Sequence, residues 1–148
     1  MMVVAYAEFM PPDPPPQWLG YRDEIRDVRR RLGESTLIVA EEGGRLLGAV
    51  TYYPDGSEEA NGGWPASWAV LRLLAVHPAA RGRGIGRLLT EECLRRARAA
   101  GRVAVGLHTT HLMTVARAMY ERMGFVRVPE FDFFPAPQFR VMAYRLTL

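Results

Sequence analysis

The sequence predicts a three-layer α/β fold with a central mixed sheet, in which all 148 residues form a single domain. Two observations predict this class. Strand-like and helix-like segments alternate along the chain, with hairpin patterns near both ends. In the middle, residues 71–89 read as a buried strand, a glycine-rich turn and a helix, an arrangement suited to binding phosphate.

The N-terminal part predicts one short element and one amphipathic helix. Met1–Met10 fits either a short helix or an edge strand, and the proline-rich run 11–16 excludes regular structure. A helix is expected next, because acids come early, arginines come late, Gly33 ends the segment, and apolar residues recur every three or four positions: Trp18, Tyr21, Ile25, Val28 and Leu32.

A hairpin and a long loop follow. Thr36–Ala40 and Arg45–Tyr53 read as strands joined by the turn residues 41–44. Residues 54–65, rich in Gly, Glu and Asp, form a loop, and loops of this length are often either binding loops or surface excursions.

The central strand ends in a turn suited to an anion. The apolar run from Leu71 to Val76 indicates a strand buried on both faces, which Pro78 ends. Arg81–Gly86 then has three glycines at alternate positions, so unshielded backbone N–H groups can adopt positive φ and surround an anion.

The helix after this turn begins near Ile85 and ends at Gly101. Its unpaired N-terminal N–H groups and positive dipole end face the turn, beside Arg81, Arg83 and Arg87. We interpret the turn as a pyrophosphate site; the alternative is a tight connection that only packs the helix on the sheet.

The rest of the chain continues the alternation. In order, we expect a strand at Arg102–Leu107, a helix with Met113, Ala116, Tyr120 and Met123 on one face, a strand at Phe125–Val128, an aromatic, proline-broken loop at Glu130–Pro137 and a last strand at Gln138–Leu148.

The spacing of the glycines excludes two other phosphate-binding motifs. A dinucleotide fingerprint needs the third glycine one residue later, and a P-loop needs a lysine, which this chain lacks. The stretch Leu74–Gly86 instead resembles the acetyl-CoA-binding motif of the Gcn5-related N-acetyltransferases, the GNAT family. Ala116–Phe125 resembles the A-x-x-x-Y-x-x-x-G-F segment of the same family, at the usual distance.

The resemblance implies a GNAT-like sheet whose two middle strands splay apart to admit the pantetheine arm of acetyl-CoA, the co-substrate. It implies that the backbone of the central strand holds the pantetheine and polarises the thioester, while the turn holds the pyrophosphate. The implied cofactor-binding residues are Leu74, Ala75, Val76, Arg81, Gly82, Arg83, Gly84, Ile85, Gly86 and Arg87.

The same resemblance gives Tyr120 the role of general acid toward the departing thiolate, although the residue also fits a core aromatic on the same helix face as Met113. The residue at the family's general-base position is Val70 rather than glutamate. The base is then either solvent or another group. Five groups are candidates, and each also fits a solvated loop residue: Glu58, Glu59, His108, His111 and Asp132.

Two further departures concern the cofactor and the sheet edge. Met113 replaces a frequent asparagine, which removes a polar contact to the cofactor. Met1–Met10 is too short for both an edge strand and a helix, so either the strand is present and the helix short, or the strand is missing. In the second case Thr36–Ala40 is an open edge at which a homodimer could form. No metal site is expected, because His108 and His111 lack further ligands nearby.

Composition narrows the function class. The 19 basic residues, all arginine, exceed the 16 acids by three, which suits an anionic cofactor, while the lack of a basic, aromatic-interleaved stripe disfavours nucleic acid. No membrane span or signal peptide is evident, so we expect a cytoplasmic protein. Cys93 is the single cysteine, which excludes an internal disulfide, and it fits a buried helix face better than a nucleophile.

We therefore expect an acyl-CoA-dependent N-acyltransferase, in which a primary amine of a small molecule attacks acetyl-CoA directly. Aromatic residues in loops could line the acceptor pocket or cap the sheet ends: Trp64, Trp68, Phe131, Phe133 and Phe134. Two alternatives stay open. One is an acyl-CoA-binding module with little catalysis, and the other is an acetyltransferase of a macromolecule such as a protein N-terminus or tRNA.

Overall fold

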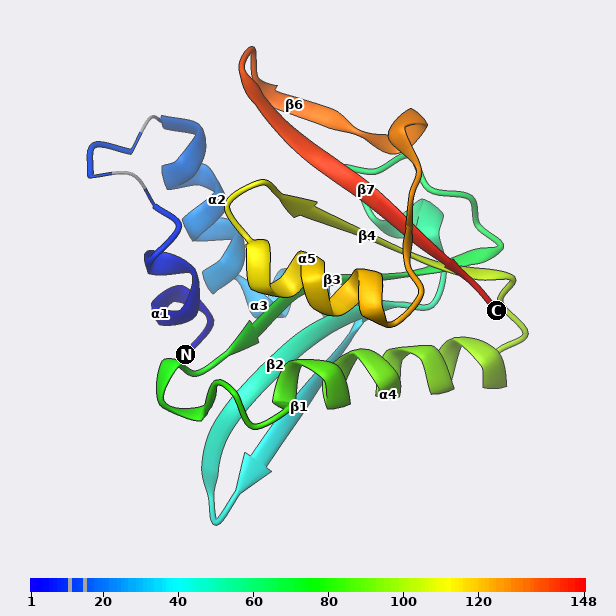
Figure 1. Ribbon diagram of the computed structural model, residues 1–148, viewed down its shortest axis with the longest axis horizontal. Helices are drawn as coiled ribbons and strands as arrows, with labels where there is room; N and C mark the ends of the chain where they lie inside the picture. The colour runs from blue at the N-terminus through cyan, green and yellow to red at the C-terminus, as the bar shows by residue number, and fades with distance from the viewer. Residues whose placement is uncertain (11, 15) are drawn as a thin grey trace.

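The computed structural model describes residues 1–10, 12–14 and 16–148, so two positions of the proline-rich run, 11 and 15, lie outside the described residues. The described strands form one mixed sheet in the order β1-β2-β3-β4-β7-β5, with β6 paired to β7 (Figure 1). The strands are β1 Thr36–Glu42, β2 Arg45–Tyr53, β3 Trp68–Val76, β4 Ala104–Thr110, β5 Val126–Arg127, β6 Phe133–Ala136 and β7 Phe139–Thr147.

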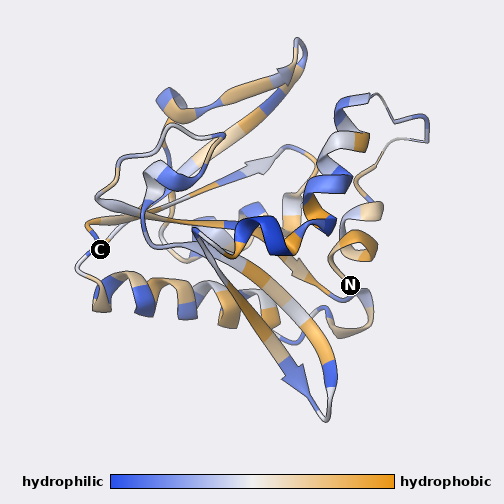
Figure 2. Cartoon of the chain, turned by 180° about the vertical axis from the view of Figure 1, so that it is seen from behind, coloured by the Kyte–Doolittle hydropathy of each residue, from blue (hydrophilic) through white to orange (hydrophobic). Residues whose placement is uncertain are grey.

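Helices cover both faces of this sheet. They are α1 Met2–Ala7, α2 Pro16–Arg26, α3 Val28–Arg31, α4 Ile85–Ala99 and α5 Thr114–Arg122. Figure 2 shows hydrophilic and hydrophobic residues alternating along α4, as expected for a helix with one buried face. None of the helices in the described part of the chain has the length and apolar character needed to cross a bilayer.

Two core clusters define the layers. On one face, α4 and α5 pack on the sheet through Leu89, Cys93 and Tyr120. On the other face, α1 and α2 pack through Met2, Ala5 and Ile25 against β2 and β3. The expected three-layer fold is thus confirmed. Burial raises the pKa of the Cys93 thiol to about 12, which agrees with a packing role rather than a nucleophile.

The two middle strands diverge. The parallel strands β3 and β4 pair only over Trp68–Val70 and Ala104–Gly106. Beyond Val70, β3 stays paired with β2 as far as Val76, whereas β4 stays paired with β7 as far as Thr110. Each strand follows its own outer neighbour, so the sheet opens into a cleft between them, as the family resemblance implied.

The N-terminal segment is a helix. α1 occupies Met2–Ala7, so the edge strand usual in the family is missing from the described residues and β1 ends the sheet. The second of the two expected arrangements is therefore the observed one. The homodimer expected at this open edge stays a prediction.

The expected long helix before Gly33 is broken at Asp27. The Asp27 carboxylate accepts a hydrogen bond from the Arg30 amide at 3.1 Å and so caps α3. Arg31 is buried and its guanidinium donates to the carbonyls of Glu24, Ile25 and Asp27 at the C-terminal end of α2. A cation that satisfies these carbonyls stabilises the helix end, so one periodic segment forms two helices.

The expected loop at Glu130–Pro137 is partly a strand. Phe133–Ala136 forms β6, which pairs with β7. The register of this pairing shifts between Phe133 and Ala136. Proline is tolerated there because β6 is an edge strand. Smaller differences are the limits of β4, which runs from Ala104 to Thr110, and of β5, which has only two residues.

Candidate functional site

A cavity of about 560 Å³ lies in the cleft where β3 and β4 separate. Its walls are the last residues of β3, the glycine turn with the start of α4, the region of α5, and α1. It is lined by nine of the ten predicted cofactor-binding residues, Leu74, Ala75, Val76, Arg81, Gly82, Gly84, Ile85, Gly86 and Arg87. Arg83 is the exception.

The glycine turn has the backbone geometry that an anion site needs. Gly82 and Gly84 adopt φ of 75° and 78°, and Gly84 caps α4 in the left-handed conformation. The first backbone hydrogen bond of α4 runs from the Leu88 amide to the Gly84 carbonyl at 3.0 Å. The amides that precede Leu88 have no helical acceptor, so they are available to a ligand at the positive end of the helix.

The three arginines of the turn are paired with carboxylates. Arg81 lies 2.6 Å from Glu8, Arg83 lies 2.8 Å from Glu42, and Arg87 lies 2.8 Å from Glu91. Because these pairs are at least partly exposed, each contributes little to stability and exchanges readily for another anion. The pair with Glu42 holds Arg83 toward β1, away from the cavity lining.

Tyr120 lies in the core between α5 and the sheet, and only 4% of its surface is exposed. Its ring meets Phe125 edge-on, with 5.6 Å between the ring centroids. Tyr120 does not line the cavity, whereas its neighbours Ala116 and Met119 on the same helix and Met123 just after it do. Burial raises the pKa of the Tyr120 phenol above its ordinary value of 10, so the group keeps its proton at neutral pH.

Val70, at the family's general-base position, is almost fully buried in a cluster with Tyr53 and Trp64. Of the five alternative bases, Glu58 is exposed on the long loop, whereas Glu59 is buried and lies 3.3 Å from Arg72. Neither of them lines the cavity in the cleft. In the described residues, Glu59 Oε2 has no hydrogen-bond partner.

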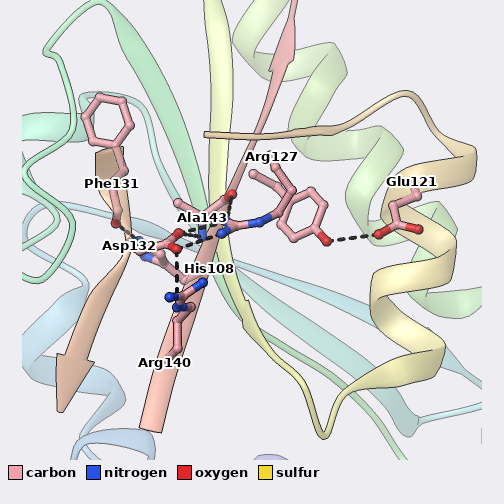
Figure 3. A network of polar contacts seen from close by, with 8 residues as sticks. His108, Glu121, Arg127, Phe131, Asp132, Arg140 and Ala143 are labelled. Carbon is pink, nitrogen blue, oxygen red and sulfur yellow. Dashed lines mark hydrogen bonds and ion pairs between the residues drawn. The ribbon is translucent and has the colours of Figure 1, made fainter. Parts of the chain in front are cut away.

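Asp132 serves the structure of the β6–β7 region (Figure 3). It forms a two-point ion pair with Arg127 at 2.6 and 2.7 Å and accepts a hydrogen bond from the Ala143 amide at 2.7 Å. Although burial acts to raise the pKa of Asp132, these hydrogen bonds and the charge of Arg127 lower it overall. A carboxylate held in this way is a poor proton acceptor.

The two histidines are placed differently. The His108 ring is partly buried and its Nε2 lies 2.8 Å from the Phe131 carbonyl, so Nε2 carries the proton that it donates (Figure 3). Burial lowers the pKa of His108. His111 is exposed and lines a second cavity of about 530 Å³, which shares Glu8, Phe9 and Leu112 with the first.

Trp64, Trp68 and Phe131 cap the sheet end, one of the two expected alternatives, whereas Phe133 and Phe134 lie on β6 and Phe134 is exposed. Trp64 is buried, stacks on Phe131 with ring centroids 4.8 Å apart, and covers Gly106 at the point where β3 and β4 diverge. Other aromatic side chains line the second cavity, namely Phe9, Trp18 and Phe139.

Sequence reasoning missed α1 as part of the site. Ala5, Tyr6, Glu8 and Phe9 all line the cleft cavity, although the segment carries no motif. Arg81 fixes it there through Glu8 and through a 3.2 Å hydrogen bond to the Ala5 carbonyl. Met113 also lines the cavity, which supports the expected loss of one polar contact there.

A splayed mixed sheet with a glycine turn at a helix N-terminus defines the class of acyl-CoA-dependent transferases. The sequence model of the Acetyltransferase (GNAT) family matches residues 3–125. The chain therefore belongs to the GNAT family of acetyl-CoA-dependent acetyltransferases.

Several curated relatives are mycothiol acetyltransferases. The protein from Cellulomonas flavigena is 36% identical over 107 residues, covering 68% of this chain and 31% of the relative. The protein from Geodermatophilus obscurus is 30% identical over 112 residues, covering 74% of this chain and 35% of the relative. The chain thus spans about a third of the length of these relatives.

Solved structures share the fold. A Gcn5-related N-acetyltransferase from Kribbella flavida is 28% identical, with a TM-score of 0.59 over 78% of this chain and 68% of that one. A protein from Salmonella typhimurium, solved with its cofactor acetyl-CoA, is 20% identical, with a TM-score of 0.60 over 87% of this chain and 72% of that one.

Proposed function

We propose that the protein is an N-acetyltransferase that moves the acetyl group of acetyl-CoA to a primary amine of a small molecule. The observation that carries this proposal is one cavity lined both by the glycine turn with the start of α4 and by Leu74–Val76 of β3, beyond the end of the pairing between β3 and β4. Such a cavity accommodates the pyrophosphate at one end and the thioester at the other.

In this proposal, the glycine turn and the end of β3 bind different parts of acetyl-CoA. The amides from Gly82 to Arg87 bind the pyrophosphate, with Arg81 and Arg87 exchanging their carboxylate partners for it. The backbone of Leu74–Val76, which lines the cavity and is not paired with β4, binds the pantetheine arm and polarises the thioester carbonyl.

The reaction is a direct attack. The amine nitrogen bonds to the acetyl carbon, the carbon–sulfur bond breaks, and the nitrogen loses a proton. Tyr120 supplies a proton to the thiolate when the pantetheine arm brings the sulfur between the strands. No protein base stands at the usual position, so the amine must arrive neutral, and kcat/KM should rise with pH up to the pKa of the acceptor amine.

The acceptor assignment draws on two observations. The curated relatives are named for mycothiol, a small molecule. The second cavity joins the first through shared residues and is lined by the aromatic residues Phe9, Trp18 and Phe139, which suit an acceptor with an apolar part.

Calorimetric titration with acetyl-CoA, followed by CoA release assayed with a panel of primary amines between pH 6 and 9, tests the proposal. We expect binding with micromolar affinity or better and turnover with at least one small amine. Absence of acetyl-CoA binding would contradict the assignment of the glycine turn.

Tyr120→Phe tests the general acid. It should lower kcat about 100-fold, a typical contribution of acid catalysis, while leaving the Kd of acetyl-CoA nearly unchanged. Tyr52→Phe is the matched control, because Tyr52 is another buried phenol of the same core cluster and lies on β2. If Tyr120→Phe turns over as fast as the wild type, water supplies the proton instead.

One observation favours a second candidate function. Val70 removes the usual carboxylate from the site, which fits an acyl-CoA-binding module with little catalysis. Tight acetyl-CoA binding without CoA release for any amine, at any pH in the assay, would favour that function.

A further inference from the structure

Tyr6 lies in the cleft beside Leu74, near the end of β3. It belongs to α1, lines the cavity, and donates its hydroxyl proton to the Leu74 carbonyl of β3 at 3.0 Å. These two residues are 68 positions apart in the sequence. The contact joins α1 to the strand proposed to hold the thioester.

A bulge in β3 explains why the Leu74 carbonyl is available to Tyr6. Leu73 has a positive φ of 54°, and the pairing with β2 jumps from Ala75 to Arg72. Leu73 and Leu74 therefore have no partner in the register with β2, and pairing with β4 has already ended at Val70. The phenol of Tyr6 fills the place of the missing strand partner.

This hydrogen bond determines what Tyr6 can offer a ligand. A phenol has one proton and two lone pairs, so a hydroxyl that donates to a carbonyl can only accept from a second partner. Burial, with Tyr21 and Tyr120 nearby, raises the pKa of Tyr6 well above 10, so the group is neutral. Tyr6 thus presents an uncharged acceptor to the cleft.

The other polar side chains that line the cavity are less suited to an amine. Arg81, Arg87 and Arg122 can only donate hydrogen bonds. The Glu8 carboxylate is already paired with Arg81 at 2.6 Å. Thr114 is the first residue of α5 and does not belong to β3, the strand proposed to hold the thioester. Of this set, Tyr6 is the residue bonded to the Leu74–Val76 strand.

We propose that Tyr6 accepts a hydrogen bond from an N–H of the attacking amine and so aims the nitrogen lone pair at the thioester carbon. This inference rests on the proposed acetyltransferase function. Tyr6 takes up no proton itself: the carbon–nitrogen bond forms, the carbon–sulfur bond breaks, and the proton of the resulting ammonium leaves to water. A misdirected amine reacts slowly even when bound, because attack requires alignment of the reacting atoms.

Tyr6→Phe keeps the ring and removes the hydroxyl. We expect kcat/KM for the amine to fall between 10- and 100-fold, while the Kd of acetyl-CoA and the slow hydrolysis of acetyl-CoA without amine stay within twofold of wild type. Tyr52→Phe is the matched control, because Tyr52 is a buried phenol on β2 that does not line the cavity. It should retain the wild-type rate of transfer.

Three results bear on the proposal in different ways. Transfer at the wild-type rate in Tyr6→Phe would overturn it. A parallel loss of acetyl-CoA affinity, hydrolysis and transfer would also overturn it, since Tyr6 would then only shape β3. Wild-type protein that neither binds acetyl-CoA nor releases CoA would instead refute the proposed function on which the inference depends.

Discussion

The ion pair between Arg81 and Glu8 holds the Arg81 guanidinium at the edge of the cavity. Arg81 lies 2.6 Å from Glu8, and both side chains are partly exposed. Glu8 and the pyrophosphate of acetyl-CoA compete for the same guanidinium. The carboxylate therefore keeps Arg81 close to the site but lowers the net gain on binding.

Glu8→Gln should accordingly bind acetyl-CoA more tightly, by about two- to fivefold, because a surface pair of this kind is worth less than about 1 kcal/mol. Calorimetric titration at low salt measures the change. Glu92→Gln is the control, since Glu92 pairs with Arg95 and Arg96 on α4 and does not line the cavity. Weaker binding by Glu8→Gln would mean that Glu8 supports the ligand rather than competing with it.

The buried ring of His108 makes the free energy of unfolding depend on pH. Burial holds its pKa below the ordinary 6.5, so below that pH the unfolded chain binds more protons than the folded protein. The free energy of unfolding must then fall as the pH drops through 6.5 toward the lowered pKa. The contribution of the neutral, buried ring to the free energy of unfolding is therefore fully present only above 6.5.

We expect the wild type to lose more stability between pH 7.5 and pH 5 than His108→Gln does, in urea unfolding followed by fluorescence. His111→Gln, which changes an exposed ring nearby, should follow the wild type. Equal pH dependence of the wild type and His108→Gln would assign the loss to other groups.

At the scale of elements, α4 offers a matched pair of glycines. Gly84 precedes the helix and Gly101 follows it, with φ of 78° and 67°, and a Cβ at either position would meet no other atom within 4 Å. A side chain at either position brings similar strain, about 1–2 kcal/mol. Only Gly84 lines the cavity.

Gly84→Glu should therefore weaken acetyl-CoA binding more than 100-fold, because its carboxylate would stand where the pyrophosphate binds. Gly101→Glu should keep the wild-type affinity within about threefold while losing similar thermal stability. Titration and thermal unfolding of both variants separate the two effects. Unchanged affinity in Gly84→Glu would place the phosphates elsewhere.

At the scale of the whole molecule, charge distinguishes the candidate acceptors. The net charge of +3 arises from 19 arginines and 16 acids, and three of those arginines flank the glycine turn. Salt should therefore weaken the interaction with the anionic cofactor, while a small amine in an aromatic-lined cavity should be little affected.

Raising the salt from 50 to 500 mM should increase the Kd of acetyl-CoA severalfold and leave the KM of a small amine within twofold. Steady-state kinetics and titration at four salt concentrations measure both quantities. A KM that rises steeply with salt would favour a macromolecular polyanion such as tRNA as acceptor, because such binding releases many counterions.

The sequence by itself determined the centre of the protein. The glycine turn, α4 and the tyrosine helix α5 were predicted close to their observed limits, whereas the buried strand begins at Trp68 rather than at the predicted Leu71. These features depend on local properties: positive φ at glycine, free amides at a helix start and apolar periodicity. The hairpin strand Arg45–Tyr53 was predicted with its observed limits for the same reason.

Only the tertiary structure decided how the site is completed. The break at Asp27 depends on the burial of Arg31. The N-terminal segment joins the site because Arg81 pairs with Glu8, and the role inferred for Tyr6 depends on its contact with the bulge in β3, 68 residues away. A short apolar segment such as Met1–Met10 fits a helix or a strand equally well. Its conformation follows from the surface against which it packs, and residues far apart in the chain form that surface.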